Sequence, residues 1–203
     1  MNPNTTAVIL VGYQNDYFAK DGILRGVIED PTSVDSVLAA SVDFIRAVAD
    51  TGMMIISTPI VLTPDYRAMA NPVGILNTIK ESGAFKAGTV GAQTIPQILE
   101  FGDRIEYVSG KVGFNAFSNT ALGDVLMERG ITDVLVAGMV TSLCIDSTGR
   151  AAYERGYDVT ILSNCTSART PTEHEFFCDN VFPLYGRATT TDLILAEFAE
   201  TAA

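Results

Sequence analysis

The stretch "VAGMVTSLCIDSTGRAAYERGYDVTIL", residues 136–162, decides the fold because it contains a complete strand–helix–strand unit. An apolar run opens the stretch, a polar turn follows, and the residues from about Leu143 to Glu154 have the pattern of a helix. A second apolar run, rich in β-branched residues, closes it. Two strands joined through a helix lie parallel in one sheet, so the stretch predicts a parallel βαβ unit.

The same alternation of short apolar runs and amphipathic stretches continues along the chain. Several runs are apolar on both faces, as are the strands of a parallel sheet that helices cover on each side. We therefore expect an α/β fold, a three-layer Rossmann-like parallel sheet with helices on both faces. The predicted strands are residues 7–12, 53–58, 104–109, 133–139 and 158–163.

The segment from Asp30 to Gly52 has the clearest helix pattern. Asp30 suits the N-terminal cap, Pro31 suits the first turn, and Gly52 suits the end of the helix. An apolar stripe runs between these signals, so this helix would join the first two strands. Further helices are expected near residues 119–129 and 191–201.

The length and composition of the chain fit one domain. A chain of 203 residues with 47% hydrophobic and 18% charged residues buries enough apolar surface to fold around one core. No repeat, low-complexity tract or linker divides the sequence. We therefore predict a single domain over residues 1–203.

The charge of the chain bears on its partners and its location. A formal net charge of −11 repels nucleic acid and anionic membrane surfaces, so a small-molecule substrate fits better. The opening residues, MNPNTT, lack the basic stretch of a signal peptide, and no apolar run is long enough to span a bilayer. We expect a cytoplasmic protein that binds neither nucleic acid nor membrane.

The cysteine and histidine counts limit disulfides and metal sites. Cys144, Cys165 and Cys178 are an odd number without a C-x-x-C pair, which favours free thiols in a reducing compartment. The chain has one histidine, which excludes a zinc or iron site built from several histidines. These counts do not exclude carboxylate sites for hard cations. We expect no metal and no cofactor.

Cys144 lies where a nucleophile would act. In an open parallel sheet, ligands bind beyond the carboxyl ends of the strands, and Cys144 follows such an end in the first turn of a predicted helix. The partial positive charge of a helix start favours the thiolate, and free N–H groups there stabilise an oxyanion. The alternative is that Cys144 is a small buried apolar residue.

Lys111 follows another predicted strand and is placed at the same edge of the sheet as Cys144. A neighbouring ammonium would favour the thiolate further. A lysine after a strand also commonly points into solvent, so both interpretations stay open for Lys111 taken alone.

Several segments in order resemble the isochorismatase-like cysteine hydrolases, a superfamily that includes nicotinamidases, carbamoylsarcosine amidases and isochorismatases. The resemblance covers nearly the whole chain and includes the G-x-x-T-x-x-C turn before the helix. It implies a single isochorismatase-like hydrolase domain with a Rossmann-like sheet. The segments are "ILVGYQNDYF" (9–18), "SGKVGFNAFSNTAL" (109–122), "ITDVLVAGMVTSLCIDST" (131–148) and "RAAYERGYDVTILSNCTSART" (150–170), followed by His174.

The resemblance also implies roles for particular residues. Members of the superfamily typically have a triad of aspartate, lysine and cysteine, and Lys111 and Cys144 match the lysine and the cysteine. The superfamily often has a cis peptide bond in the turn, which would fall at Met139–Val140. Its oxyanion donors would correspond to the backbone N–H groups of Val140 and Cys144.

The triad aspartate has no match, because Gly12 occupies its place in "GYQNDYF" while the residues after it are kept. Asp16, Asp21 and Glu29 follow the first strand closely enough to supply a substitute carboxylate. A purely structural role is also open for Asp16, as a turn or cap residue that forms hydrogen bonds with the backbone.

Four other side chains are candidates for lining the pocket, and three of them have an alternative role. Phe114 and Phe117 follow Lys111 but also suit the core, and Arg169 suits an anionic substrate or an ion pair with a carboxylate. Gln14 belongs to the segment that the resemblance covers. His174 matches a histidine that is common in the superfamily and also suits helix packing.

Two functions therefore remain open. The first is a hydrolase of a small amide, ester or thioester that forms an acyl-enzyme on Cys144 and uses a non-standard acid/base. The second is a catalytically degenerate member that binds a small ligand or a partner subunit. Isochorismatase activity is disfavoured without the aspartate, and nicotinamidase activity without histidines after the second strand. The resemblance implies a homodimer or a larger homo-oligomer.

Overall fold

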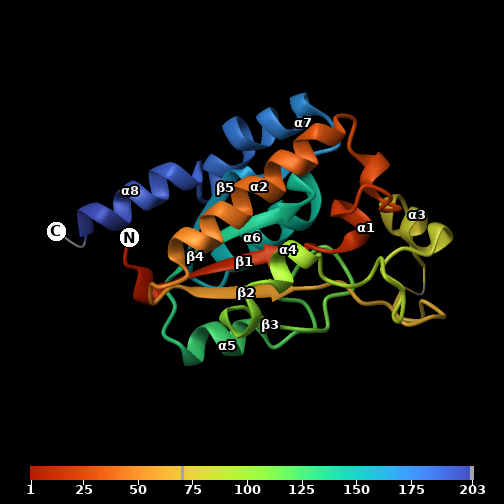
Figure 1. The fold of residues 1–203 in the computed structure, drawn as a ribbon, viewed down its shortest axis with the longest axis horizontal. Helices are drawn as coiled ribbons and strands as arrows, with labels where there is room; N and C mark the ends of the chain where they lie inside the picture. Colours follow the sequence, from red (N-terminus) through yellow and green to blue (C-terminus); the bar gives the residue numbers. More distant parts are fainter. Residues whose placement is uncertain (70, 202–203) are drawn as a thin grey trace.

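A computed structural model of the protein describes residues 1–69 and 71–201, so Ala70, Ala202 and Ala203 of the expected domain lie outside the described residues. The centre is a six-stranded parallel sheet with the strand order β3-β2-β1-β4-β5-β6 (Figure 1). The expected α/β fold is thereby confirmed. The strands are β1 (Thr6–Val11), β2 (Met54–Thr58), β3 (Glu106–Tyr107), β4 (Asp133–Met139), β5 (Asp158–Ser167) and β6 (Arg187–Thr189).

Helices cover both faces of the sheet and also lie beyond the carboxyl ends of β1 and β2 (Figure 1). Two π-helical turns, Thr141–Ile145 and Phe177–Val181, lie next to α6 and α7. The α-helices are α1 (Asn15–Phe18), α2 (Pro31–Val48), α3 (Ile75–Ser82), α4 (Pro96–Leu99), α5 (Leu122–Glu128), α6 (Asp146–Tyr153), α7 (Pro171–Phe176) and α8 (Thr191–Thr201).

Two hydrophobic cores form because successive residues of a strand point to opposite faces of the sheet. In β1, Val8 and Leu10 pack on the face that α2 and α8 cover, whereas Ala7 and Ile9 pack on the face of α5 and α6. All six residues of β1 are buried. The run that is apolar on both faces therefore corresponds to a central strand with helices on each side.

Helix α2 begins as its sequence predicts. The Asp30 carboxylate accepts a hydrogen bond from Thr32 N, and Pro31 occupies the first turn. The apolar stripe, which includes Val34, Val37 and Ile45, is buried. The helix ends at Val48, a few residues before Gly52.

The structure differs from the predicted strands at both edges of the sheet and in β5, which extends to Ser167 and not only over the predicted 158–163. Strand β3 has only two residues instead of the predicted 104–109, because Gly102–Arg104 forms a 3₁₀ turn and β3 lies at the edge of the sheet. At the other edge, β6 was not predicted. It is three residues long and partly exposed, so it lacks the continuous apolar run of the central strands.

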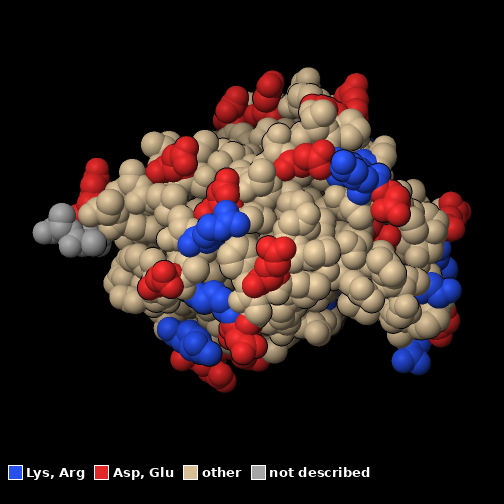
Figure 2. Space-filling model, viewed as in Figure 1, with Lys and Arg blue, Asp and Glu red and all other residues tan. Residues whose placement is uncertain are grey.

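The surface in Figure 2 has acidic side chains spread over several elements, with fewer basic side chains among them. This distribution agrees with 24 acidic against 13 basic residues in the sequence. Among the helices of the described residues, we find none that is both long and apolar enough to cross a bilayer.

Gly138 in β4 allows β1 and β4 to approach each other closely just before the turn that contains Cys144. Its φ is +125°, and a Cβ atom there would lie 1.9 Å from the carbonyl oxygen of Val11. No side chain fits without displacing β1, because the obstructing atom belongs to the backbone.

We predict that Gly138→Ala lowers the free energy of unfolding by about 3 kcal/mol, through backbone strain and overpacking between β1 and β4. Urea unfolding followed by circular dichroism measures this change. Gly26→Ala is the matched control, since a Cβ at Gly26 has no neighbour within 4 Å, and we expect a change within about 0.5 kcal/mol. Equal stability of the two variants would contradict the prediction.

Candidate active site

Lys111 is fully buried next to the carboxyl ends of the central strands. It pairs with Ile60 in an isolated parallel bridge, a few residues beyond the ends of β2 and β3. This bridge fixes the backbone of Lys111 and directs its side chain into the protein. The structure therefore differs from the alternative in which Lys111 points into solvent.

The Lys111 ammonium and the Cys144 thiol are in direct contact. Lys111 Nζ lies 3.5 Å from Cys144 Sγ and also donates a hydrogen bond to the carbonyl oxygen of Gly113. Cys144 is 5% exposed. Among the described residues, no carboxylate forms an ion pair with Lys111.

Cys144 belongs to the π-helical turn Thr141–Ile145, which leads directly into α6. The Met139–Val140 peptide bond before this turn is cis. The Val140 carbonyl oxygen accepts hydrogen bonds from Leu143 N and Ile145 N, which tighten the turn around Cys144. The turn thus places the thiol beyond the carboxyl end of β4.

Gly12 follows β1 and has a left-handed backbone conformation with φ of +74°. A Cβ atom there would lie 3.4 Å from the Met139 carbonyl oxygen and 3.5 Å from Cδ2 of Tyr17, which are ordinary contacts. Space therefore exists for a first side-chain atom, but the positive φ favours glycine over L residues.

None of the three candidate substitute carboxylates is directed at Cys144 by a contact in the structure. Asp16 is 2% exposed, and its Oδ2 accepts a hydrogen bond from Phe85 N at 2.5 Å. Burial raises the pKa of Asp16, and the hydrogen bond from Phe85 opposes that rise. Asp21 and Glu29 are exposed. Asp16 thus forms a hydrogen bond with the backbone, which agrees with the structural role that the sequence left open for it.

The segment of residues 60–93, which the structure describes except for Ala70, is held next to the site by the polar residues that follow Gly12. The Gln14 side chain, fully buried, donates to the Ile60 and Ala92 carbonyl oxygens and accepts from Ile60 N, at 2.6, 2.7 and 2.7 Å. Asn15 Nδ2 donates to the Val90 carbonyl oxygen at 2.8 Å. The Gln14 side chain therefore connects the backbone at Ile60 to the backbone at Ala92 through hydrogen bonds.

Cys144 faces a small enclosed cavity of about 10 Å³. Its walls are mainly apolar and come from the 60–93 segment, from α3, and from the residues after Lys111. Phe114 is one of these walls, as are three residues of α3. The lining residues are Tyr17, Ile60, Leu62, Met69, Ile75, Leu76, Ile79, Val112, Gly113, Phe114, Leu143 and Cys144.

Two other candidate pocket residues lie away from this cavity. Phe117 packs in the core on the α5 and α6 face, where its ring lies under the Arg155 guanidinium at 4.8 Å. Arg169 forms an ion pair with Glu173 at 3.0 Å. Neither lines the cavity at Cys144.

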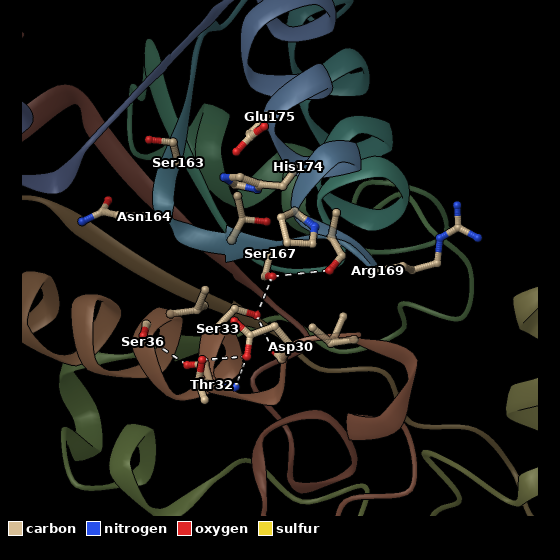
Figure 3. Close-up of a pocket in the computed structure, with 15 residues that line it drawn as sticks. Asp30, Thr32, Ser33, Ser36, Ser163, Asn164, Ser167, Arg169, His174 and Glu175 are labelled. Carbon is tan, nitrogen blue, oxygen red and sulfur yellow. Dashed lines mark hydrogen bonds between the residues drawn. The ribbon is translucent and has the colours of Figure 1, made fainter.

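A larger and more polar pocket of about 400 Å³ lies between the start of α2, the end of β5 and α7 (Figure 3). Ser33 of α2 and Ser167 of β5 meet across it at 2.9 Å. Arg169 and His174 line this pocket. Arg169 and His174 therefore line a pocket other than the cavity at Cys144.

His174 connects α7 to the turn that contains Cys144. Its Nδ1 lies 3.1 Å from Thr141 Oγ1, which in turn lies 2.9 Å from Thr166 Oγ1. Its Nε2 lies 3.6 Å from Cys178 Sγ. Burial lowers the pKa of His174. These contacts fit the packing role that the sequence left open for this histidine.

The other two thiols differ chemically from Cys144, because neither contacts a lysine or an arginine among the residues that the structure describes. Burial raises the pKa of Cys165 to about 12 and that of Cys178 to about 11. All three cysteines are free. In the part of the chain that the structure describes, no group of three or more His, Cys, Asp or Glu side chains is arranged to hold a metal ion.

Sequence reasoning missed two parts of the site. It did not identify α3, whose Ile75, Leu76 and Ile79 cover Cys144, although their i, i+1, i+4 spacing is a helical signal. It also gave no role to Tyr17, whose ring lies beside Gly12 and lines the same cavity. Within the motif "QNDY", the sequence indicated a role for the Asp16 carboxylate instead.

Several known proteins are similar to this chain in sequence and in fold. A ureidoacrylate amidohydrolase, RutB, from Methylobacterium radiotolerans is 27% identical over 199 residues, which cover 92% of this chain and 76% of that protein. An Arabidopsis thaliana protein named "Probable inactive nicotinamidase" is 24% identical over 83% of this chain and 84% of its own length.

Among solved structures, a cysteine hydrolase from Pseudomonas syringae pv. phaseolicola 1448A superimposes with a TM-score of 0.85 at 21% identity, over 98% of this chain and 95% of that one. Nicotinamidase PncA from Bacillus subtilis gives a TM-score of 0.73 at 22% identity, over 94% and 100%. At these identities the two structures support the fold. The sequence model of the isochorismatase domain matches residues 6–192, and the chain therefore belongs to the isochorismatase family.

Proposed function

We propose that the protein is a cysteine-dependent hydrolase of a small acyl compound, with an acyl-enzyme on Cys144. The observation that carries this proposal is the 3.5 Å contact between Lys111 Nζ and Cys144 Sγ inside the core. Both side chains are buried, so water screens their interaction only weakly. The contact supports a thiol that is prepared for nucleophilic attack.

The burial of Lys111 favours a negatively charged Cys144. An ammonium that is removed from water is unfavourable unless an anion lies beside it. The Gly113 carbonyl oxygen, its other hydrogen-bond partner, is neutral. A thiolate at Cys144 therefore stabilises the buried charge of Lys111, and Lys111 in turn stabilises the nucleophile.

The rest of the attack site follows from the turn after β4. The thiolate would add to the acyl carbon, and the backbone N–H groups of Val140 and Cys144 would stabilise the resulting oxyanion. The turn holds Cys144 near the start of the helical residues 141–153. The first backbone N–H groups of a helix have no hydrogen-bond partner within the helix. This arrangement supports acyl transfer to sulfur.

Gly12 shapes the choice of substrate, because the aspartate that the resemblance places there is replaced. A positioned acid or base typically contributes about 10²–10⁴-fold to rate, and its loss affects amides most since amines leave poorly without a proton. Esters, thioesters and activated acyl groups need less help. The relatives named ureidoacrylate amidohydrolase nevertheless support an amide as substrate.

The cavity favours an apolar acyl group. Its walls beyond Cys144 are largely aliphatic, and its volume of about 10 Å³ requires α3 or its neighbours to move when a substrate enters. An uncharged acyl group avoids the desolvation of a charge against Ile75, Leu76 and Ile79.

A catalytically degenerate member that binds a small ligand or a partner subunit is the second candidate. Gly12 and the small size of the cavity favour it. A relative named "Probable inactive nicotinamidase" adds support. The retained contact between Lys111 and Cys144 favours the hydrolase.

Further proposals concern the setting of the protein. We propose one hydrolase domain over residues 1–203 that acts in the cytoplasm as a homodimer or larger homo-oligomer. The net charge of −11 supports a small-molecule substrate over nucleic acid or membrane.

We predict that iodoacetamide alkylates Cys144 at least tenfold faster than Cys165 or Cys178 at about pH 6.5, because among the three described thiols only Cys144 contacts an ammonium group. Lys111→Ala should lower the Cys144 rate by about tenfold or more. Mass spectrometry of the digested protein at increasing times gives the three rates separately.

Lys86→Ala is the matched control, since it removes a lysine that forms no ion pair with any described residue, and it should leave the Cys144 rate unchanged. If Cys144 reacts no faster than Cys178, the nucleophile is not prepared and the degenerate alternative gains support. If Cys144 is fast but insensitive to Lys111→Ala, the proposed role of the lysine is wrong.

A second prediction separates the structural role of Asp16 from an acid/base role. Asp16→Ala should lower the free energy of unfolding at neutral pH by about 1–3 kcal/mol, because Phe85 N would lose its hydrogen-bond acceptor. Asp21→Ala, at an exposed position, should change it by less than about 0.5 kcal/mol. Urea unfolding measures both. A fully stable Asp16→Ala variant that loses only turnover would instead assign Asp16 to the chemistry.

A further inference from the structure

Tyr17 is the polar side chain in the cavity that has no assigned role. It belongs to the short helix α1, which begins just after Gly12, and is 2% exposed. Its ring packs against Phe85 with 5.4 Å between centroids, and both Tyr17 and Cys144 line the enclosed cavity. Tyr17 and Cys144 therefore border the same space.

The hydroxyl of Tyr17 forms no hydrogen bond with any residue that the structure describes, unlike other buried tyrosine hydroxyls nearby. The Tyr13 hydroxyl lies 2.5 Å from Ser41 Oγ, and the Tyr66 hydroxyl donates to the Ala84 carbonyl oxygen at 2.8 Å. Among the described residues, the only side-chain oxygen or nitrogen that is shut off from solvent without a partner is Ser142 Oγ, so the unpaired Tyr17 hydroxyl is accessible to a small group. An unpaired phenol in a cavity beside a nucleophile suits a partner that arrives with the substrate.

The position of the ring relates Tyr17 to the replaced aspartate. A Cβ atom added to Gly12 would lie 3.5 and 3.6 Å from Cδ2 and Cε2 of Tyr17, so a side chain at position 12 would lie along this ring. Gly12 leaves that edge of the ring uncovered by a side chain. The phenol is thus the proton-carrying group that lies along the direction of the missing carboxylate.

The phenol is in its acid form at neutral pH. Burial is the largest cause that raises the pKa of Tyr17 above its ordinary value, and the nearby negative charges of Cys144 and Asp16 raise it further. A group that remains protonated beside a thiolate is suited to donate a proton rather than to accept the proton of the thiol.

We propose that Tyr17 is the general acid that protonates the leaving group during acylation of Cys144. This inference rests on the proposed function, since it requires an acyl-enzyme on the cysteine. It assigns the step that Gly12 leaves without a carboxylate and explains how a thiolate held by Lys111 can react without a base to activate it.

The proposed step balances in protons and electrons. The Cys144 thiolate forms a bond to the acyl carbon, and the electron pair of the carbonyl double bond moves to oxygen. When this intermediate collapses, the bond from the acyl carbon to the leaving nitrogen or oxygen breaks, and the leaving atom takes the Tyr17 proton. Water then attacks the thioester, its proton passes to the Tyr17 phenolate, and the carbon–sulfur bond breaks to return the thiolate and release the acid.

The test measures kcat/KM for a set of acetyl compounds whose leaving groups become steadily more basic: p-nitrophenyl acetate, phenyl acetate, trifluoroethyl acetate and acetanilide. Tyr17→Phe keeps the ring and its packing but removes the proton. We expect kcat/KM for trifluoroethyl acetate to fall about 10²-fold more than for p-nitrophenyl acetate, whose leaving group needs little protonation.

Tyr13→Phe is the matched control, because Tyr13 is also fully buried and close in sequence but bonds Ser41 instead of facing the cavity. It should change kcat/KM for all four probes by one common factor. An equal common factor for Tyr17→Phe would overturn the inference and leave Tyr17 as a packing residue. Thermal unfolding of both variants checks that each is folded.

Intact-mass measurement after mixing with p-nitrophenyl acetate separates this inference from the proposed function. An acetyl adduct on wild type that is absent in Cys144→Ala supports the acyl-enzyme. If that adduct forms but Tyr17→Phe shows no added dependence on the leaving group, only the role of Tyr17 fails. If wild type forms no adduct on Cys144, the proposed function fails and the inference fails with it.

Discussion

The buried contact between Lys111 and Cys144 is the interaction on which the site depends. A fully buried ammonium requires a partner, and the structure gives it a sulfur at 3.5 Å and a neutral carbonyl oxygen. The contact joins segments that are 33 residues apart in sequence. The bridge that fixes Lys111 and the helical turn that fixes Cys144 both serve to bring these two atoms together.

The residues after Gly12 hold the walls of the cavity. Gln14, Asn15 and Asp16 each use a side chain to bond backbone groups of residues 60–93, and this segment leads from β2 over the cavity through α3. Because these bonds are buried or close to the site, their loss would loosen the cover over Cys144. The segment "QNDY" is therefore mainly a structural clamp, with Tyr17 as its member that faces the cavity.

Gly12 has a structural explanation as well as a chemical consequence. Its φ of +74° is a conformation in which glycine has no steric penalty, so the turn after β1 is suited to this residue. The chemical consequence is that no carboxylate extends from the end of β1. Tyr17 and the buried Lys111 are the neighbours of the thiol to which our proposals assign the proton and the positive charge.

The sequence alone predicted the central sheet and its strong elements well, because the signals for them are local. The apolar runs of β1, β2 and β4, and the cap and stripe of α2, depend on residues that are neighbours in the chain. The short edge strands were predicted poorly, since β3 and β6 depend on pairing with a neighbour rather than on an apolar run of their own.

For the site, the sequence by itself determined the candidates: a cysteine in the turn after one strand, a lysine after another, and a glycine after the first strand, where the resemblance implies an aspartate. Only the tertiary structure decided which of these side chains meet. It placed Lys111 against Cys144, turned Asp16 toward the Phe85 backbone and brought Tyr17, whose hydroxyl bonds no described residue, to the wall of the same cavity. The reason is physical: the direction and burial of a side chain depend on segments distant in sequence that pack around it, and no local pattern encodes those contacts.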